Sequence, residues 1–217
     1  MQYMNGQLRL AGPHVYIDQN NKLQRAKAIQ LIEEGKSETT AHAWIDFPAV
    51  TSLKTRASPT SATFEKVHNL TIVLTYWDQE LERLQSVTYS MVDPHTNDHF
   101  FVRGALGMLI HELRSTVLPN LELLIVHSDG AAKHFRSKFL YYLICRLSKE
   151  FYLVIIWYYN APGEGKGAPD EEGGLWKILN RIHIRNGKTI TGFFSFSPPL
   201  SLASSPSALQ VDTFKEQ

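Results

Sequence analysis

Two short apolar segments constrain the fold of this chain most strongly. Leu121–Val126 and Phe151–Tyr159 are apolar runs of strand length, and such runs are typical of strands buried on both faces of a sheet. Between them, apolar residues recur every four positions, which predicts a helix from about residue 131 to 147. The members of this stripe are Phe135, Phe139, Leu143 and Leu147. The pattern therefore predicts a buried strand, a helix and a second buried strand in succession.

Three further segments upstream have the patterns of strands. Thr40–Phe47 alternates Ala41, Ala43 and Ile45 with polar or aromatic residues, which is the period of a strand. Residues 70–77 are β-branched and aromatic, and residues 85–92 alternate again after a charged turn at 78–83, so these two strands should form an antiparallel hairpin. Residues 51–66 are rich in Ser, Thr, Lys and Pro, which predicts a loop.

The remaining helices are indicated by apolar spacing and by capping residues. Residues 101–114 place Val102, Ala105, Leu109 and Leu113 on one face, after a cap-rich loop at 93–100. Residues 22–34 predict a short amphipathic helix that stops at Gly35, with Leu23, Ala26, Ile29 and Ile32 in its stripe. A shorter helix is expected at about 175–182.

The order strand, strand, strand, helix, strand, helix, strand, helix predicts an α/β fold with a mixed five-stranded sheet flanked by helices. This order matches the ribonuclease H-like fold. We expect an N-terminal extension with a short helix at residues 1–39, the core domain at 40–186, and a loosely ordered Ser/Pro-rich tail at 187–217.

Composition excludes several classes of protein. The formal net charge is +1, so any charge-driven partner must bind a local patch. The lone Cys145 excludes an intrachain disulfide and a multi-cysteine zinc cluster, and its position in the second helix predicts a core residue. The start of the chain lacks a signal-peptide pattern, and the longest apolar stretch is far shorter than the roughly 20 residues of a membrane span. We expect an intracellular protein without membrane partners.

Acidic residues stand where the strands of such a sheet end. Two-metal phosphoryl transfer needs carboxylates that converge on Mg²⁺ or Mn²⁺. Asp46 ends the first strand and Asp129 ends the fourth, and Asp170, Glu171 and Glu172 precede the last helix. We expect Asp46, Asp129 and Asp170 to be catalytic metal ligands, with Glu171 or Glu172 as alternatives for the third position.

Each acid also has a purely structural interpretation. Asp129-Gly130 is common turn chemistry, the acids at 170–172 suit a helix N-terminus, and Asp46 could be an exposed strand end. Asp78 also follows a strand and is an alternative first ligand.

Three motifs resemble a group of eukaryotic transposon-encoded transposases of the DDE/DDD type, over about residues 40–182. That group has an Asp-Phe-Ala-Glu-Asn-like segment, then Ser-Asp-Gly followed by a Gln-Phe-Arg/Lys helix, and then His-Gly-Lys-Gly-x-x-Asp-Gly-x-Gly-Gly. The corresponding residues here are Ile45-Asp46-Phe47-Pro48-Ala49, Ser128-Asp129-Gly130, and Gly165-Lys166-Gly167 with Asp170 and Gly173-Gly174.

The resemblance implies a magnesium- or manganese-dependent nuclease that cleaves and transfers DNA strands in recombination of a transposable element. It also implies a nuclear location and a possible homo-oligomer. The chain departs from the pattern at His134, Glu164 and Glu171, which replace Gln, His and Gly, and it lacks the Glu-Asn pair. A truncated or degenerate copy, catalytically inactive but able to bind DNA or protein, is therefore the alternative. A third alternative is a hydrolase that uses carboxylates as general acid and base without metal.

Basic residues beside these motifs are candidates for contacts with DNA phosphates. They are Lys133, His134, Arg136, Lys138 and Lys166, and a solvated basic helix face explains the first four equally well. Asp93, His95, Asp98 and His99 could bind a metal, but helix capping is the favoured interpretation because they lie in a loop just before a helix.

Overall fold

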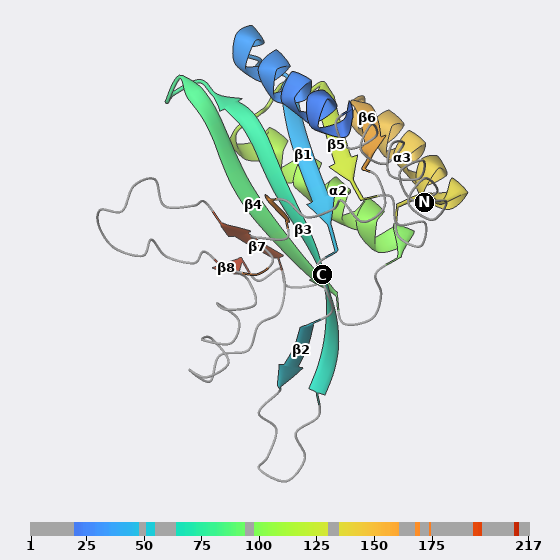
Figure 1. Cartoon of the computed structure of the whole chain (residues 1–217). Helices are drawn as coiled ribbons and strands as arrows, with labels where there is room; N and C mark the ends of the chain where they lie inside the picture. Colours follow the sequence, from blue (N-terminus) through green and yellow to red (C-terminus); the bar gives the residue numbers. More distant parts are fainter. Residues whose placement is uncertain are drawn as a thin grey trace, which may run out of the picture.

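The computed structural model (Figure 1) describes residues 20–47, 51–54, 64–93, 98–129, 135–160, 168–169, 174, 193–196 and 211–212. Its central element is a mixed sheet with the strand order β6-β5-β1-β3-β4-β7-β8, and β2 pairs with β3 beside this path. The five central strands are β1 (Thr40–Asp46), β3 (Phe64–Asp78), β4 (Arg83–Asp93), β5 (Leu123–Ser128) and β6 (Val154–Tyr159). β1, β5 and β6 run parallel, whereas β3 is antiparallel to both β1 and β4. The predicted mixed α/β sheet is confirmed.

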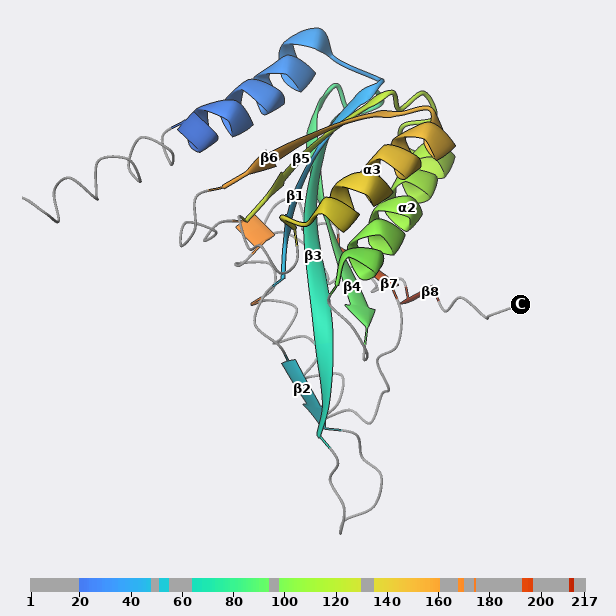
Figure 2. The same cartoon turned by 90° about the vertical axis from the view of Figure 1, so that its right-hand side faces the viewer.

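Helices cover both faces of this sheet. α2 (His99–Thr116) and α3 (Lys138–Phe151) lie side by side on one face, and the N-terminal helix at residues 20–35 lies over the opposite face (Figure 2). α2 connects β4 to β5 and α3 connects β5 to β6, so both helices begin at the edge of the sheet where β1 and β5 end. This edge, the carboxyl edge, therefore collects strand ends and helix N-termini. Among the described helices, none is both long and apolar enough to span a membrane.

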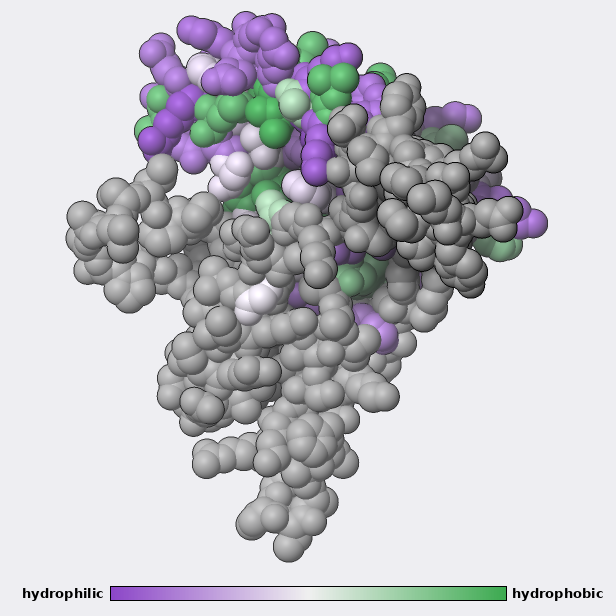
Figure 3. Space-filling model, in the orientation of Figure 1, coloured by the Kyte–Doolittle hydropathy of each residue, from purple (hydrophilic) through white to green (hydrophobic). Residues whose placement is uncertain are grey.

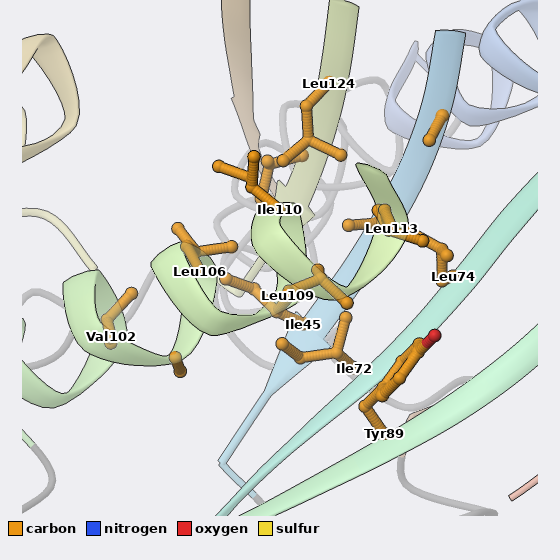
Figure 4. Close-up of a cluster of buried hydrophobic side chains, with 14 of the residues drawn as sticks. Ile45, Ile72, Leu74, Tyr89, Val102, Leu106, Leu109, Ile110, Leu113 and Leu124 are labelled. Atoms are coloured by element: carbon orange, nitrogen blue, oxygen red, sulfur yellow. The ribbon is translucent and has the colours of Figure 1, made fainter. Parts of the chain in front are cut away.

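The main core lies between α2 and the sheet (Figure 4). One face of α2 is buried, as its spacing predicts, and packs on inward-facing residues of the central strands, including Ile45, Ile72 and Leu124. The buried residues of α2 are Val102, Ala105, Leu106, Leu109, Ile110 and Leu113. Burying each large aliphatic side chain stabilises the fold by about 1.5–3 kcal/mol relative to exposure, so this face fixes α2 on the sheet.

Local chemistry sets the ends of the helices. The side chain of Asp98 accepts from the backbone N–H groups of Phe100 and Phe101 at 2.8 and 3.1 Å, which caps α2. The capping interpretation of Asp98 is thereby confirmed. The N-terminal helix ends one residue later than predicted, because Lys36 rather than Gly35 adopts the left-handed backbone, with φ of 42°. Tyr152 does the same after α3, with φ of 48°.

Several expectations from the sequence are wrong in detail. Residues 51–54 form β2 instead of a loop, and β3 begins at Phe64, because the two segments pair with each other. α3 begins at Lys138, so Phe135 precedes the helix, and Phe139 is exposed rather than in the stripe. β6 follows α3 from Val154 and lies at the edge of the sheet formed by the described residues, with Val154 59% exposed.

The N-terminal helix is also rotated from its predicted orientation. Leu23 is half exposed and Ala26 is exposed, while Ala28 and Ile32 are buried. Its outward side is mainly hydrophilic with apolar residues between (Figure 3).

Within the segment expected to be a tail, β7 (Phe193–Phe196) pairs with β4 and β8 (Val211–Asp212) pairs with β7. The helix expected at 175–182 lies outside the described residues.

Candidate functional site

Asp46 and Asp129 come together at the carboxyl edge of the sheet. β1 and β5 are parallel neighbours whose last paired residues are Ile45 and Ser128. Asp46 is the last residue of β1, and Asp129 directly follows β5. Both side chains are half-buried. Asp46 Oδ1 accepts from the backbone N–H of Phe47 at 2.8 Å, which orients this carboxylate. Two of the predicted acids thus occupy adjacent strand ends, where ligands gather in open α/β sheets.

The end of β5 is held in place by residues of β6. Trp157 Nε1 donates to Ser128 Oγ at 2.9 Å, and Ser128 Oγ donates to the carbonyl of Asp129 at 3.0 Å. The backbone N–H of Asn160 donates to the Ser128 carbonyl at 2.7 Å. Because each bond ends on Ser128 or Asp129, the indole of Trp157 positions the backbone that carries the Asp129 carboxylate.

Aromatic rings support the same edge from the face of α2 and α3. The ring of Phe47 lies 5.9 Å from that of Phe101 and 5.4 Å from that of Phe135, between centroids. Phe135 is fully buried, and the centroid of its ring lies 6.2 Å from that of Trp157. Tyr159 Oη donates a hydrogen bond to the Phe135 carbonyl at 3.0 Å. These separations are typical of favourable aromatic pairs. The residue after Asp46 is thereby fixed between the first turn of α2 and the segment before α3.

A buried pair of histidines lies on the other face of the sheet. His42 Nε2 and His127 Nδ1 are 2.9 Å apart, and the ring of Tyr158 stacks on His127 at 4.8 Å. Since side chains alternate along a strand, His42 shares its face with Asp46 and His127 shares its face with Asp129. The histidine pair therefore lies behind the two aspartates on the face covered by the N-terminal helix.

Both histidines are held neutral. Burial, the neighbouring His127 and the Arg25 guanidinium lower the pKa of His42 to about 3. Burial and Arg25 lower the pKa of His127 to about 4. Among the described residues, His42 Nδ1 and His127 Nε2 have no hydrogen-bond partner. Burial favours the uncharged form because a charged imidazole would lose its hydration without gaining a counter-ion.

Arg25 joins the N-terminal helix to this region. Its Nη1 donates to Asn160 Oδ1 at 2.7 Å, and its guanidinium carbon lies 4.4 Å from the centre of the Trp44 ring. Asn160 is 97% buried, at 3% exposure, just after β6. The arginine therefore connects the helix to β1 and to the end of β6.

Other predicted site residues are placed as follows. Arg136 and Lys138 are exposed beside the start of α3. Asp78 ends β3 at the opposite edge of the sheet, because β3 is antiparallel to β1, and its Oδ1 accepts from the N–H groups of Glu80 and Leu81 in the following turn. It cannot join Asp46 and Asp129, so the alternative first ligand was wrong. The predicted residues outside the described part of the chain are Lys133, His134, Lys166, Asp170, Glu171 and Glu172.

Within the described ranges, no group of three or more His, Cys, Asp or Glu side chains could hold a metal ion. Asp46 and Asp129 supply hard oxygen donors that suit Mg²⁺ or Mn²⁺, and the acids predicted to complete the set lie beyond residue 160. Cys145 is exposed on α3 rather than in the core. His95 lies outside the described residues, and the side chain of Asp93 is not described.

Sequence reasoning missed the histidine pair. His42 lies among the polar and aromatic positions of the alternation at residues 40–47. The apolar run that predicts the next strand ends at Val126, whereas β5 continues through His127 to Ser128. The feature that could have indicated the pair is a histidine in each of two strands, β1 and β5, that are neighbours in the expected fold.

Comparison with known protein families gives a match over most of the chain. The family model described as a domain of unknown function (DUF8701) matches residues 24–192. This range contains the five central strands, α2, α3, most of the N-terminal helix and both aspartates. No curated protein and no solved structure matches the chain.

Proposed function

The chain belongs to the family of this domain of unknown function (DUF8701), and we propose that it is a transposase-like enzyme that cleaves and transfers DNA strands by metal-dependent phosphoryl transfer. The observation that carries the proposal is the position of Asp46 and Asp129 on adjacent ends of β1 and β5. Two carboxylates on neighbouring strand ends can share divalent cations about 4 Å apart.

The topology supports a ribonuclease H-like fold for this enzyme. The central order β6-β5-β1-β3-β4, with β3 antiparallel to its neighbours, agrees with the element order expected for that fold. β6 ends beside β5 at the same edge, with Asn160 bonded to Ser128. Asn160, the described residue that follows β6, therefore lies beside the end of β5. We assign the third ligand of the proposed set to Asp170, Glu171 or Glu172, which follow later in the sequence.

Asp46, Asp129 and Asp170 would hold two Mg²⁺ or Mn²⁺ ions, with Glu171 or Glu172 as the alternative third ligand. The bound metals supply activation of water or a 3′-hydroxyl and stabilisation of the leaving oxygen. The chain itself orients the carboxylates, through the Phe47 N–H at Asp46 and through Trp157 and Ser128 at Asp129. Arg136 and Lys138 contribute positive charge beside the site for the DNA backbone.

Nicking of supercoiled plasmid DNA by the full chain in Mn²⁺ tests the proposal. We expect nicking that stops with chelator and is lost in Asp129→Asn, while Asp78→Asn nicks as the native protein does, because Asp78 lies at the opposite edge. Undiminished nicking by Asp129→Asn contradicts the metal assignment. Nicking that persists in chelator supports the metal-independent hydrolase instead.

A specific observation favours a second candidate, a non-catalytic descendant that binds DNA or protein. Glu164 and Glu171 stand where the resembling transposases have His and Gly, and added negative charge repels a phosphate unless metals neutralise it. DNA binding without nicking, in the presence of Mn²⁺, would support this candidate and exclude the enzyme.

A further inference from the structure

The outward face of α3 combines aromatic and basic side chains. Lys138, Tyr142, Arg146 and Lys149 are exposed and follow one another at spacings of three or four residues, so they share one side of the helix. We call these four residues the α3 stripe. Tyr142 is 60% exposed and lies between two cations, each one helical turn away. Only Leu140 and Leu147 of α3 are buried.

The charge of α3 is not balanced on the helix itself. Its one acid, Glu150, is bound at 2.5 Å by Arg103 of α2. Among the described residues no ion pair involves Lys138, Arg146 or Lys149. The α3 stripe therefore presents positive charge on both sides of an exposed ring, although the whole chain is almost neutral at +1.

The start of the stripe adds further aromatic surface. Phe139 is 56% exposed and stacks on His99 at 5.4 Å, and Arg136 lies 5.4 Å from the Tyr159 ring. This end of α3 lies at the carboxyl edge of the sheet, because α3 follows β5. A strand that lies along the stripe is thus directed toward the carboxyl edge, where β1 and β5 end.

This combination matches one class of ligand. Single-stranded nucleic acid is bound by cations that follow its phosphates and by aromatic rings on which unpaired bases stack, at about 1–3 kcal/mol per base. Duplex DNA has no unpaired base to offer Tyr142. We propose that the α3 stripe binds an unpaired DNA strand through base stacking on Tyr142 and phosphate contacts from Lys138, Arg146 and Lys149. The inference rests on the proposed function, because that function makes DNA the substrate. It adds that the α3 stripe binds a single-stranded part of this DNA.

Fluorescence anisotropy measures binding of DNA to the α3 stripe. EDTA in the buffer removes divalent metal, so the proposed metal site does not contribute to this binding. The probes are labelled oligo(dT) and a labelled duplex of the same length. We expect Tyr142→Ala to bind oligo(dT) about 5- to 150-fold more weakly, with less than a twofold change for the duplex. The matched control is Tyr152→Asn, which removes a 92% exposed tyrosine at the far end of α3 and keeps a residue suited to the left-handed backbone. This control should bind as the native chain does.

Salt titration gives a second, independent measurement. Arg146→Ala should reduce the slope of log affinity against log salt by about 0.7 on the single strand. Native affinity of Tyr142→Ala for oligo(dT), equal losses on single strand and duplex, or no binding of oligo(dT) by the native chain would each overturn the inference. Circular dichroism confirms that each variant is folded. Binding that follows these expectations in a chain that cannot nick DNA would support the stripe while excluding the proposed enzyme.

Discussion

His42 Nε2 lies 2.9 Å from His127 Nδ1 in the interior of the protein, with the two rings 2% and 0% exposed. One ring donates and the other accepts, so the bond requires that at least one of these nitrogens carries no proton. A second proton on either ring would place a charge in a site whose nearby charge is the Arg25 cation. The pair is therefore a contact of two neutral imidazoles.

The stability of the protein should fall as the pH drops from about 6.5 toward 4. The pKa of His42 is lowered to about 3 and that of His127 to about 4, both from 6.5, so in this window the unfolded chain binds protons that the folded chain does not. Unfolding becomes easier by up to about 1.4 kcal/mol per pH unit for each histidine. Chemical denaturation at pH 7, 6 and 5 measures this, and His42→Gln should flatten the slope.

The control for this prediction is His111→Gln, because His111 is exposed on α2 and should leave the slope unchanged. Ring resonances of His42 and His127 that titrate between pH 7 and 5 in the folded protein would contradict the prediction.

Divalent metal should stabilise the folded chain through Asp46 and Asp129. A ligand that binds the folded state alone raises the free energy of unfolding by about 2.7 kcal/mol at a hundred times its Kd. We expect Mn²⁺ to raise Tm for the native chain but not for Asp129→Asn, measured by calorimetry. The matched variant Asp78→Asn should respond to Mn²⁺ as the native chain does, because Asp78 caps a turn at the opposite edge. Equal shifts in Asp129→Asn and the native chain would place the ion elsewhere.

Trp157→Phe should weaken Mn²⁺ binding without removing a ligand. The change deletes the Nε1 donor that holds Ser128 Oγ, and Ser128 in turn bonds the Asp129 carbonyl. We expect a several-fold higher Mn²⁺ Kd in a thermal-shift titration, since positioning of a ligand by surrounding residues commonly affects metal affinity by about 10-fold or more. Tyr159→Phe is the control, because it loses the hydroxyl that bonds the Phe135 carbonyl and Tyr141 and leaves the bonds of Ser128 intact. Unchanged affinity in Trp157→Phe would mean that the indole does not position Asp129.

Asp98→Ala should destabilise the protein by about 1 kcal/mol, the usual cost of removing an N-cap. The Asp98 side chain accepts hydrogen bonds from two backbone N–H groups at the start of α2. In the variant, water replaces these hydrogen bonds only in part. Urea denaturation measures the loss. Asp98→Asn keeps the acceptor oxygen and should have nearly the native free energy of unfolding. If Asp98→Asn loses as much stability as Asp98→Ala, the charge of Asp98 stabilises α2 rather than its capping hydrogen bonds.

Local patterns in the sequence determined the types of the five central strands and of the helices α2 and α3. The alternation at residues 40–47, the apolar spacing in α2 and the Asp98 cap before it each depend on neighbours a few residues apart, and the structure confirms them. The mixed α/β sheet follows from their order. The placement of Asp46 and Asp129 at strand ends could also be predicted, because strand ends are visible in the sequence.

Other features depend on which distant segments meet. Phe139 fits an apolar stripe by spacing, yet it is exposed because α3 begins at Lys138 and turns Leu140 and Leu147 toward the sheet. β6 looks like a buried strand by composition, yet it forms the edge of the described sheet. Composition records how apolar a segment is, but not whether another strand pairs with its second side.

The histidine pair is the clearest product of tertiary structure. His42 and His127 are brought together by the parallel pairing of β1 with β5, and their burial is what lowers their pKa values. The sequence by itself determined that a strand would contain His42, that another would end close to His127, and that an aspartate would stand at the end of each. Only the folded sheet decided that the imidazoles would share a hydrogen bond, because strand order and register arise from packing between segments far apart in the chain.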